Sequence, residues 1–313
     1  MDVIKTENLV KCYSKNVRVL DGISLSIKKG EIVGYLGPNG SGKTTTIKIL
    51  TNLLYPTSGH AFINGLDVNE NPKESLKAVG ALVEIPGIYD YLTPREMLTY
   101  FGRIYGMERG KIDERIRETL KSVRLADKER TKIGAFSTGM QRRLAIAKAI
   151  LHEPEILILD EPVIGLDPKG IKEVRELLRE FQKGGMTIFL SSHLLQEVGD
   201  TCDSVIFLDK ARVVAHDTVH NIRSKAGGKS IIVRFTNPLS ETEAKKIETV
   251  AGVKGVSVKN GSVQIGYDGS PDTSYQILSD LMKAGHHIVS YTPEVVSLED
   301  FYISVMSDER GVS

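Results

Sequence analysis

Short apolar runs alternate with longer stretches in which apolar residues recur three and four positions apart through the first part of the chain. The short runs contain few charges, which is typical of strands covered on both faces, and the longer spacing predicts amphipathic helices. This alternation favours an α/β fold with a largely parallel sheet and helices packed against it. The predicted strands are 31–36, 81–84, 156–160, 187–191 and 204–208. The predicted helices are 43–53, 94–105, 113–123, 141–151 and 168–183.

The pattern changes near Ser224, where Ala226 is followed by two glycines and Lys229. This composition predicts a flexible joint. The elements expected after it are strand 230–235, helix 240–250, strand 256–259, the turn Asn260-Gly261, strand 262–267, helix 274–284 and strand 287–291. Their order favours a split βαβ, ferredoxin-like α+β sandwich. We therefore predict a larger domain at 1–223 and a small accessory domain at 224–313.

Composition narrows the functional classes. Hydrophobic residues make up 41% of the 313 residues and charged residues 26%, as in ordinary globular proteins. The 41 basic and 40 acidic residues give a net charge of +1, without the basic field of a nucleic-acid binder. Cys12 and Cys202 are isolated, which indicates neither a disulfide framework nor a zinc site and fits a reducing cytosol.

Membrane and export signals are not expected either. The first residues lack a basic segment followed by an apolar run, so the sequence predicts no secretory signal. No stretch approaches the roughly 18 consecutive apolar residues of a membrane-spanning helix. If this protein moves a compound across a membrane, another chain must form the passage.

A glycine-rich segment at the end of the first predicted strand carries the clearest chemistry. Gly37-Pro-Asn-Gly-Ser-Gly-Lys43-Thr44 fits GxxxxGK[ST] and opens a predicted helix, as this motif requires. Its backbone N–H groups and the helix N-terminus suit a phosphate chain, with Lys43 on the β and γ phosphates and the Thr44 hydroxyl on Mg²⁺. A glycine-rich turn that binds nothing is the alternative, which the flanking elements disfavour. The predicted ATP-binding residues are Gly37, Pro38, Asn39, Gly40, Ser41, Gly42, Lys43, Thr44 and Thr45.

Two adjacent carboxylates end the buried-type strand 156–160. Strand alternation sends Asp160 and Glu161 in different directions, so they can perform different tasks. Asp160 suits the Mg²⁺ shell, and Glu161 suits a general base that orients and deprotonates the attacking water. Isolated acidic pairs are commonly solvated strand ends, but the presence of Lys43 upstream favours the catalytic interpretation.

Together these motifs resemble those of ABC ATPases over residues 3–220. Phe136-Ser137-Thr138-Gly139-Met140 resembles the signature segment of that family, in a form typical of many exporter subunits. It precedes a predicted helix, so Ser137 and the Gly139 amide would form an anion-binding helix N-terminus. The resemblance implies that this end contacts the γ-phosphate held by a partner subunit. Catalysis would then require a head-to-tail dimer, and one chain carrying both sets of motifs favours a homodimer.

Three further matches to the family occur at the expected places along the chain, and position rather than residue type selects the histidine among them. Gly165-Leu166-Asp167 resembles the D-loop, which crosses the dimer interface in the family. His193, just after a predicted strand, resembles the switch histidine that contacts the γ-phosphate, although a lone histidine more often has no such role. Tyr13 matches the aromatic residue that stacks on adenine, although alone it would indicate ordinary packing.

The chain departs from the family pattern at several positions. Glu84 stands where the family usually has a glutamine. This exchange resembles the variant found in bacitracin- and lantibiotic-resistance exporters. In the family, the glutamine at this position approaches Mg²⁺ and the attacking water. The resemblance therefore predicts Glu84 both as a metal ligand and as a catalytic residue. Val163 and Ile164 replace the usual Thr-Asn, and Arg142 stands where a glutamine is common.

The end of the chain adds one more likeness. Ser297-Leu298-Glu299-Asp300-Phe301 resembles the closing segment of daunorubicin-type exporter ATPases. The resemblance implies an ABC ATPase domain with a helical subdomain at about 87–150 and an ATP-hydrolysing exporter subunit. It also implies a separate integral-membrane permease and a peripheral location on the cytoplasmic face of the cell membrane. The alternatives are the ATPase of an importer with a C-terminal regulatory domain and a soluble ABC ATPase outside transport.

Overall fold

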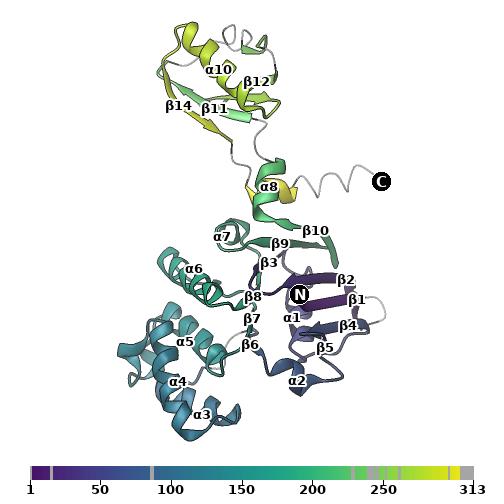
Figure 1. Ribbon diagram of the computed structural model, residues 1–313, viewed down its shortest axis with the longest axis vertical. Coiled ribbons are helices and arrows are strands. Elements are labelled where there is room, and N and C mark those ends of the chain that lie inside the picture. Colours follow the sequence, from purple (N-terminus) through teal and green to yellow (C-terminus); the bar gives the residue numbers. More distant parts are fainter. Residues whose placement is uncertain are drawn as a thin grey trace. The chain divides into compact units, whose positions relative to one another are not determined.

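The computed structural model describes residues 2–14, 17–84, 88–226, 230–237, 243, 247–250, 252–259, 262–294 and 297–303 (Figure 1). The chain divides into two compact units, Met1–Asp217 and Thr218–Ser313. The division lies next to helix α8 (Val219–Ala226), and the boundary predicted at 223/224 falls inside that helix. No helix among the described residues is long and apolar enough to cross a membrane.

A six-stranded sheet forms the centre of the first unit, with the strand order β10-β9-β3-β8-β7-β6. Every residue of β3 and β7 is buried, which explains their uninterrupted apolar sequences. The strands from β9 to β6 run parallel, so the predicted largely parallel sheet is confirmed. The strands are β3 (Ile32–Leu36), β6 (Val79–Leu82), β7 (Ile156–Leu159), β8 (Thr187–Ser192), β9 (Ser204–Asp209) and β10 (Arg212–Thr218).

Helices α3, α4 and α5 gather on one side of this unit (Figure 1). Gly80 in β6 permits a close approach of α5, since an added Cβ there would lie 2.2 Å from the Ala149 carbonyl oxygen. Helix α1 ends before the predicted limit, because Asn52 adopts φ 53°. The helices are α1 (Lys43–Leu50), α2 (Pro72–Leu76), α3 (Pro94–Ile104), α4 (Arg109–Ser122), α5 (Thr138–Ile150), α6 (Pro168–Lys183) and α7 (Leu195–Gly199), with short 3₁₀ turns at Ala126–Lys128 and Ile133–Ala135.

An antiparallel sheet with the order β2-β1-β4-β5 lies on the other side of the unit, and the hydrophobic pattern does not reveal it (Figure 1). Register shifts interrupt the pairing of β1 with β2, and Asn8 adopts φ 46°, so the two-residue alternation is lost. Its strands are β1 (Asp2–Ser14), β2 (Val17–Lys28), β4 (Ser58–Ile63) and β5 (Leu66–Asp67).

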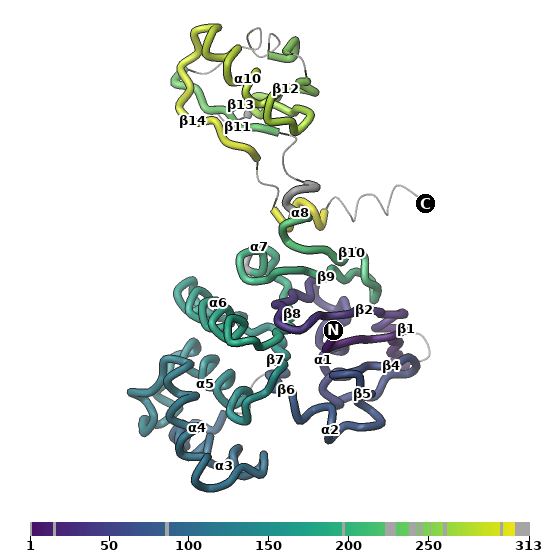
Figure 2. The backbone as a smooth tube through the Cα atoms, viewed as in Figure 1, coloured from purple at the N-terminus to yellow at the C-terminus, as the bar shows by residue number. Residues whose placement is uncertain are grey.

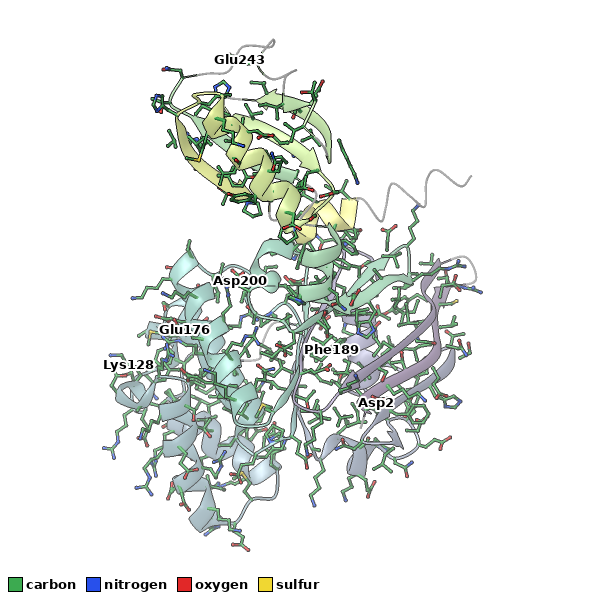
Figure 3. All side chains as sticks on the ribbon, turned by 45° about the horizontal axis from the view of Figure 1, so that its top comes forward. Asp2, Lys128, Glu176, Phe189, Asp200 and Glu243 are labelled. Carbon is green, nitrogen blue, oxygen red and sulfur yellow. The ribbon has the colours of Figure 1, made fainter. Side chains whose placement is uncertain are left out.

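The core of the first unit fills the space between the two sheets and α1. The rings of Tyr35 and Phe189 lie 5.2 Å apart between centroids, and both side chains are fully buried. Figure 3 shows Phe189 among the side chains of this interior. The tight packing fixes the carboxyl ends of β3, β7 and β8, where the site residues follow.

The second unit contains a four-stranded sheet with the order β12-β13-β11-β14, and Figure 2 traces its backbone. The pairs β11–β13, β11–β14 and β12–β13 are antiparallel, and apolar residues of one sheet face pack against α10. This arrangement confirms a small α+β domain of ferredoxin-like order. The predicted helix 240–250 and turn 260–261 lie largely outside the described residues. The elements are β11 (Ser230–Phe235), β12 (Val253–Lys259), β13 (Ser262–Tyr267), α10 (Pro271–Lys283) and β14 (Ile288–Pro293).

Candidate functional site

The glycine-rich loop joins β3 to α1 and depends on three glycines. Gly40 and Gly42 adopt φ 80° and 108°, which side chains rarely allow. An added Cβ on Gly37 would lie 2.4 Å from the Leu208 carbonyl oxygen of β9. No side chain caps the N-terminus of α1, so its first N–H groups are available to an anionic ligand.

Lys43 begins α1, and its side chain is only 6% exposed. Its ammonium donates hydrogen bonds to the carbonyl oxygens of Gly37 at 2.8 Å and Pro38 at 3.2 Å. The same ammonium lies 3.7 Å from Glu161 Oε1. The loop therefore holds a buried cation beside the predicted general base.

Asp160 follows β7, is buried, and receives two hydroxyl groups on one oxygen. Thr44 Oγ1 donates to Asp160 Oδ1 at 3.3 Å, and Ser191 Oγ donates to the same atom at 2.6 Å. Ser191 Oγ in turn accepts from the Glu161 N–H at 2.9 Å. Sequence reasoning assigned no role to Ser191, although its place at the end of β8 could have indicated one. Hydroxyl and carboxylate oxygens are donors that hard divalent cations prefer.

Glu161 has different partners from Asp160, and one of them is the predicted switch histidine. His193 Nδ1 lies 2.9 Å from Glu161 Oε2, while Lys43 faces the other carboxylate oxygen. Glu161 adopts φ 48°, a left-handed conformation that is uncommon for a glutamate and typical of strained functional positions. This backbone turn directs the two consecutive carboxylates to separate partners.

A pocket of about 320 Å³ opens beside these groups. It brings together residues of the loop, of α1 and of the ends of β7 and β8, as the sequence predicted. Val19 also lines it and gave no signal in the sequence, and so does Ile164, which the sequence marked only as a departure from the family pattern. The lining residues are Val19, Asn39, Gly40, Gly42, Lys43, Thr44, Thr45, Glu161, Ile164 and His193.

Nine predicted site residues do not line this pocket: Gly37, Pro38 and Ser41 of the loop, the buried Asp160, and Tyr13, Glu84, Ser137, Gly139 and Asp167. Tyr13 is 58% exposed, and the Lys11 ammonium lies 5.6 Å from the centroid of its ring. Ser137 caps α5, where its Oγ accepts from the Met140 N–H at 3.3 Å, and Gly139 lies in the first turn of that helix. Asp167 caps α6 by accepting from the Gly170 N–H at 2.8 Å.

Glu84 also lies outside the pocket lining and beyond β6, which ends at Leu82 rather than at residue 84. Its backbone adopts φ 58°, and its side chain forms an ion pair with Lys48 of α1. The hydrogen bond that the Lys48 ammonium donates to Glu84 raises the pKa of Lys48. Glu84 is therefore joined to the helix that carries Lys43 and Thr44, and sequence reasoning missed Lys48 because a lysine in the middle of a helix gives no signal of its own.

Comparison with known proteins decides the family. The family described as ABC transporter matches residues 20–164, and the C-terminal domain of DrrA1-3-like ATP-binding proteins matches residues 218–306. The linearmycin resistance ATP-binding protein LnrL of Bacillus subtilis is 32% identical over 307 residues, covering 97% of this chain and 98% of the relative. The chain belongs to the ABC transporter ATP-binding proteins. This ABC ATPase is thus the ATP-binding and ATP-hydrolysing subunit of a transporter.

Other relatives of the ABC ATPase agree. The bacitracin transport ATP-binding protein BcrA of Enterococcus faecalis is 34% identical over 301 residues, covering 96% of this chain and 95% of the relative. The solved structure of an ATP-binding subunit of an ABC transporter is 32% identical, with a TM-score of 0.63 over 72% of this chain and 93% of that one. A dimeric ATP-binding cassette bound to ADP and phosphate is 27% identical, with a TM-score of 0.62 over 69% and 98%.

Proposed function

We propose that this ABC ATPase is the motor of an exporter, acting as a head-to-tail homodimer on the cytoplasmic face of a separate integral-membrane permease. Likeness to LnrL and BcrA over nearly the whole chain, including the C-terminal unit, supports export. Their printed names concern linearmycin resistance and bacitracin transport. We extend this to a cargo of the antimicrobial class, which the permease recognises.

ATP fits the glycine-rich loop, where backbone N–H groups and the ammonium of Lys43 would bind the phosphates. Thr44 and Asp160 would hold Mg²⁺, and their shared hydrogen bond places a hydroxyl beside a carboxylate. No group of three or more His, Cys, Asp or Glu side chains in the described chain could hold a metal by itself. This agrees with Mg²⁺, which takes one or two protein ligands and completes its shell with water and phosphates. Bound Mg²⁺ would supply charge neutralisation at the β and γ phosphates.

Glu161 would orient the attacking water and accept its proton as the water oxygen bonds to the γ-phosphorus. The bond between that phosphorus and the bridging oxygen breaks, and ADP leaves with this oxygen. His193 contacts Glu161 at 2.9 Å and lines the same pocket, so it can position the base and donate to the γ-phosphate. These residues bind, orient and deprotonate, but they leave one side of the pocket open to another subunit.

The observation that carries the dimer is the separation of two sets of residues in one chain. Lys43, Glu161 and His193 line the pocket, whereas Ser137 and Gly139 stand at the start of α5 and do not line it. A helix N-terminus that lies outside the pocket of its own subunit is suited to an anion presented by a second one. A head-to-tail pair places each such terminus over its partner's ATP.

The test is to purify the full chain from its source membranes and identify the integral-membrane protein that accompanies it. Reconstitution of that complex in vesicles should give MgATP-dependent efflux of an antimicrobial compound, and Glu161→Gln should abolish the efflux. Accumulation in the direction of import would overturn the exporter. Association with ribosomes or other soluble assemblies in place of a permease would overturn the transport role.

A further inference from the structure

Arg142 is a cation in an unusual setting. It lies in the second turn of α5, is half-buried, and burial lowers the pKa of its guanidinium. No carboxylate of the described residues forms an ion pair with it, and its Nη2 donates to the Ile164 carbonyl oxygen at 3.4 Å. Burial of a charge without an opposite charge is costly, so the placement calls for a role beyond packing.

The adjacent Arg143 shows how this helix ordinarily accommodates a guanidinium. Arg143 pairs with Glu173 of α6 at 3.5 Å and donates to the carbonyl oxygens of Val123 and Arg124 after α4. These contacts tie α5 to its neighbouring helices and explain Arg143 as a structural residue. Arg142 instead reaches toward the loop between β7 and α6.

That loop belongs to the ATP pocket of the same subunit. The Ile164 N–H donates to the Glu161 carbonyl oxygen at 3.3 Å, closing a turn that starts at the left-handed Glu161. The Ile164 side chain lines the pocket together with Lys43 and His193. A displacement of the Ile164 carbonyl is therefore transmitted through one short turn to the backbone of the general base.

The other end of the connection is the start of α5. Arg142 lies five residues after Ser137, which corresponds to about 7.5 Å along a rigid helix. One side chain thus joins the helix end that faces a partner's ATP to the loop that carries the base for the subunit's own ATP. Helices α5 and α6, which flank the loop, pack on each other (Figure 1).

We propose that Arg142 is a positioning residue that couples the two ATP sites of the dimer, by setting the Glu161 turn according to what the start of α5 binds. The proposal rests on the head-to-tail dimer of the proposed function. Occupation of the α5 terminus by the partner's nucleotide fixes Arg142, which holds the Ile164 carbonyl and aligns Glu161. A planar guanidinium with five donors can hold a carbonyl in a defined direction, which a flexible ammonium does less well.

The experiment compares dimers with two intact ATP sites and mixed dimers in which one subunit carries Lys43→Ala. The measured quantity is turnover per intact site in each kind of dimer, and their ratio reports coupling between the sites. We expect a ratio of about five in the parent protein, which corresponds to the free energy of one hydrogen bond. In Arg142→Gln the ratio should be near one. The ATP concentration that drives dimerisation, measured by light scattering in the Glu161→Gln background, should change less than about twofold.

Lys148→Met is the matched control, because Lys148 is also a half-buried cation of α5 whose pKa burial lowers. Its ammonium lies 5.0 Å from the centroid of the Phe101 ring in α3, so the control should keep the parent ratio. Arg142→Lys, which keeps the charge, should give an intermediate ratio and remain folded if Arg142→Gln does not.

The outcomes separate the inference from the proposed function. If the Glu161→Gln parent forms no ATP-dependent dimer, the head-to-tail model fails and the coupling falls with it. If dimers form but the ratio is near one in the parent, or is the same in the parent and in both Arg142 variants, only the coupling role of Arg142 is refuted. A lower ratio in Lys148→Met equal to that of Arg142→Gln would assign the effect to general weakening of α5.

Discussion

Two parts of the first unit differ in how far contacts within the subunit order their side chains. The phosphate half-site, formed by Lys43, Thr44, Asp160, Glu161 and His193, is joined by contacts among α1 and the ends of β7 and β8. The signature half-site, residues 137–140, is organised by the start of α5, where Ser137 accepts from the N–H groups of Met140 and Gln141, and Ser137 and Thr138 are exposed. The first is ordered by its own subunit, and the second presents groups to the outside.

This difference explains how one polypeptide can hold ATP without completing the enclosure that hydrolysis needs. Catalytic groups are most effective when they are fixed before the reaction and shielded from water. The phosphate half-site meets the first condition within the chain. Under the proposed dimer, the signature half-site of the partner supplies the second, so turnover depends on association.

The largest expected effect falls on the phosphate half-site. Glu161→Gln removes the proposed proton acceptor while keeping the shape of the side chain, so turnover should fall by about 10² to 10⁴. Nucleotide binding should persist, because Lys43 and the loop N–H groups remain. Single-turnover hydrolysis and equilibrium nucleotide binding check the two parts separately. Unchanged turnover would remove Glu161 from catalysis.

Mixing subunits tests whether the half-sites act in separate chains. Lys43→Ala removes the buried ammonium that would bind the phosphates, and Gly139→Asp places a negative charge at the start of α5. Each variant alone should lose ATP-driven closure, but a mixed dimer contains one site without either lesion and should recover part of it. Light scattering with differently tagged subunits gives the measurement.

Folding should not confound that experiment, since an added Cβ on Gly139 meets no atom within 4 Å. Demonstrated mixed dimers without any recovery would contradict the simplest head-to-tail arrangement, in which one composite site suffices for closure.

Substitution of Glu84 is expected to have an effect of intermediate size. Glu84→Ala removes the partner of Lys48, so the pKa of Lys48 should fall toward its usual value. ATP binding should change by less than about threefold, as expected for an exposed ion pair, while transport per ATP hydrolysed should fall more. Glu84→Gln should be milder, and Lys48→Met serves as the control for loss of the ion pair alone. Equal coupling efficiency in wild type and Glu84→Ala would leave Glu84 as a surface charge.

The smallest effect is expected where α5 is anchored, far from its capped start. His152 Nε2 lies 3.1 Å from the Val79 carbonyl oxygen and its ring packs on Tyr105. Burial lowers the pKa of His152 below its usual 6.5, so the unfolded chain takes up a proton more readily than the folded one. The stabilisation is complete above about pH 6.5 and is lost as the pH falls through the lowered pKa.

Thermal unfolding between pH 7 and 5 measures this contribution. His152→Gln keeps a hydrogen-bonding side chain without the titration, so its acid-induced fall in melting temperature should be smaller by on the order of 2 °C. Parallel curves for the two proteins would show that the protonation of His152 does not affect stability.

Sequence reasoning succeeded where a short stretch of chain defines both the structure and the chemistry. The glycine-rich loop, Asp160 and Glu161 each follow a buried strand, and their motif spacing placed them at one edge of the parallel sheet. The antiparallel sheet was missed, because register shifts in β1 and the left-handed Asn8 conceal its alternation.

The contacts between distant segments were also beyond the sequence. Ser191 joins Asp160 to the Glu161 backbone, and Lys48 pairs with Glu84, across separations of about 30 residues or more. Neither residue type indicates such a partner, since serines and lysines are common on helices and strand ends. Their roles follow only from packing, which brings the ends of α1, β6, β7 and β8 together.

Gly80 determines how closely the last turn of α5 approaches β6. Its missing side chain lets the Ala149 carbonyl rest directly against β6, so the helix is held by backbone contact near its last turn. The 13 residues of α5 span about 20 Å from this contact to the cap at Ser137. By that length, a tilt of about 10° at Gly80 would sweep the capped end through about 3 Å, the reach of one hydrogen bond. A bulkier residue at position 80 would push the last turn of α5 away from β6 and displace the start of the helix.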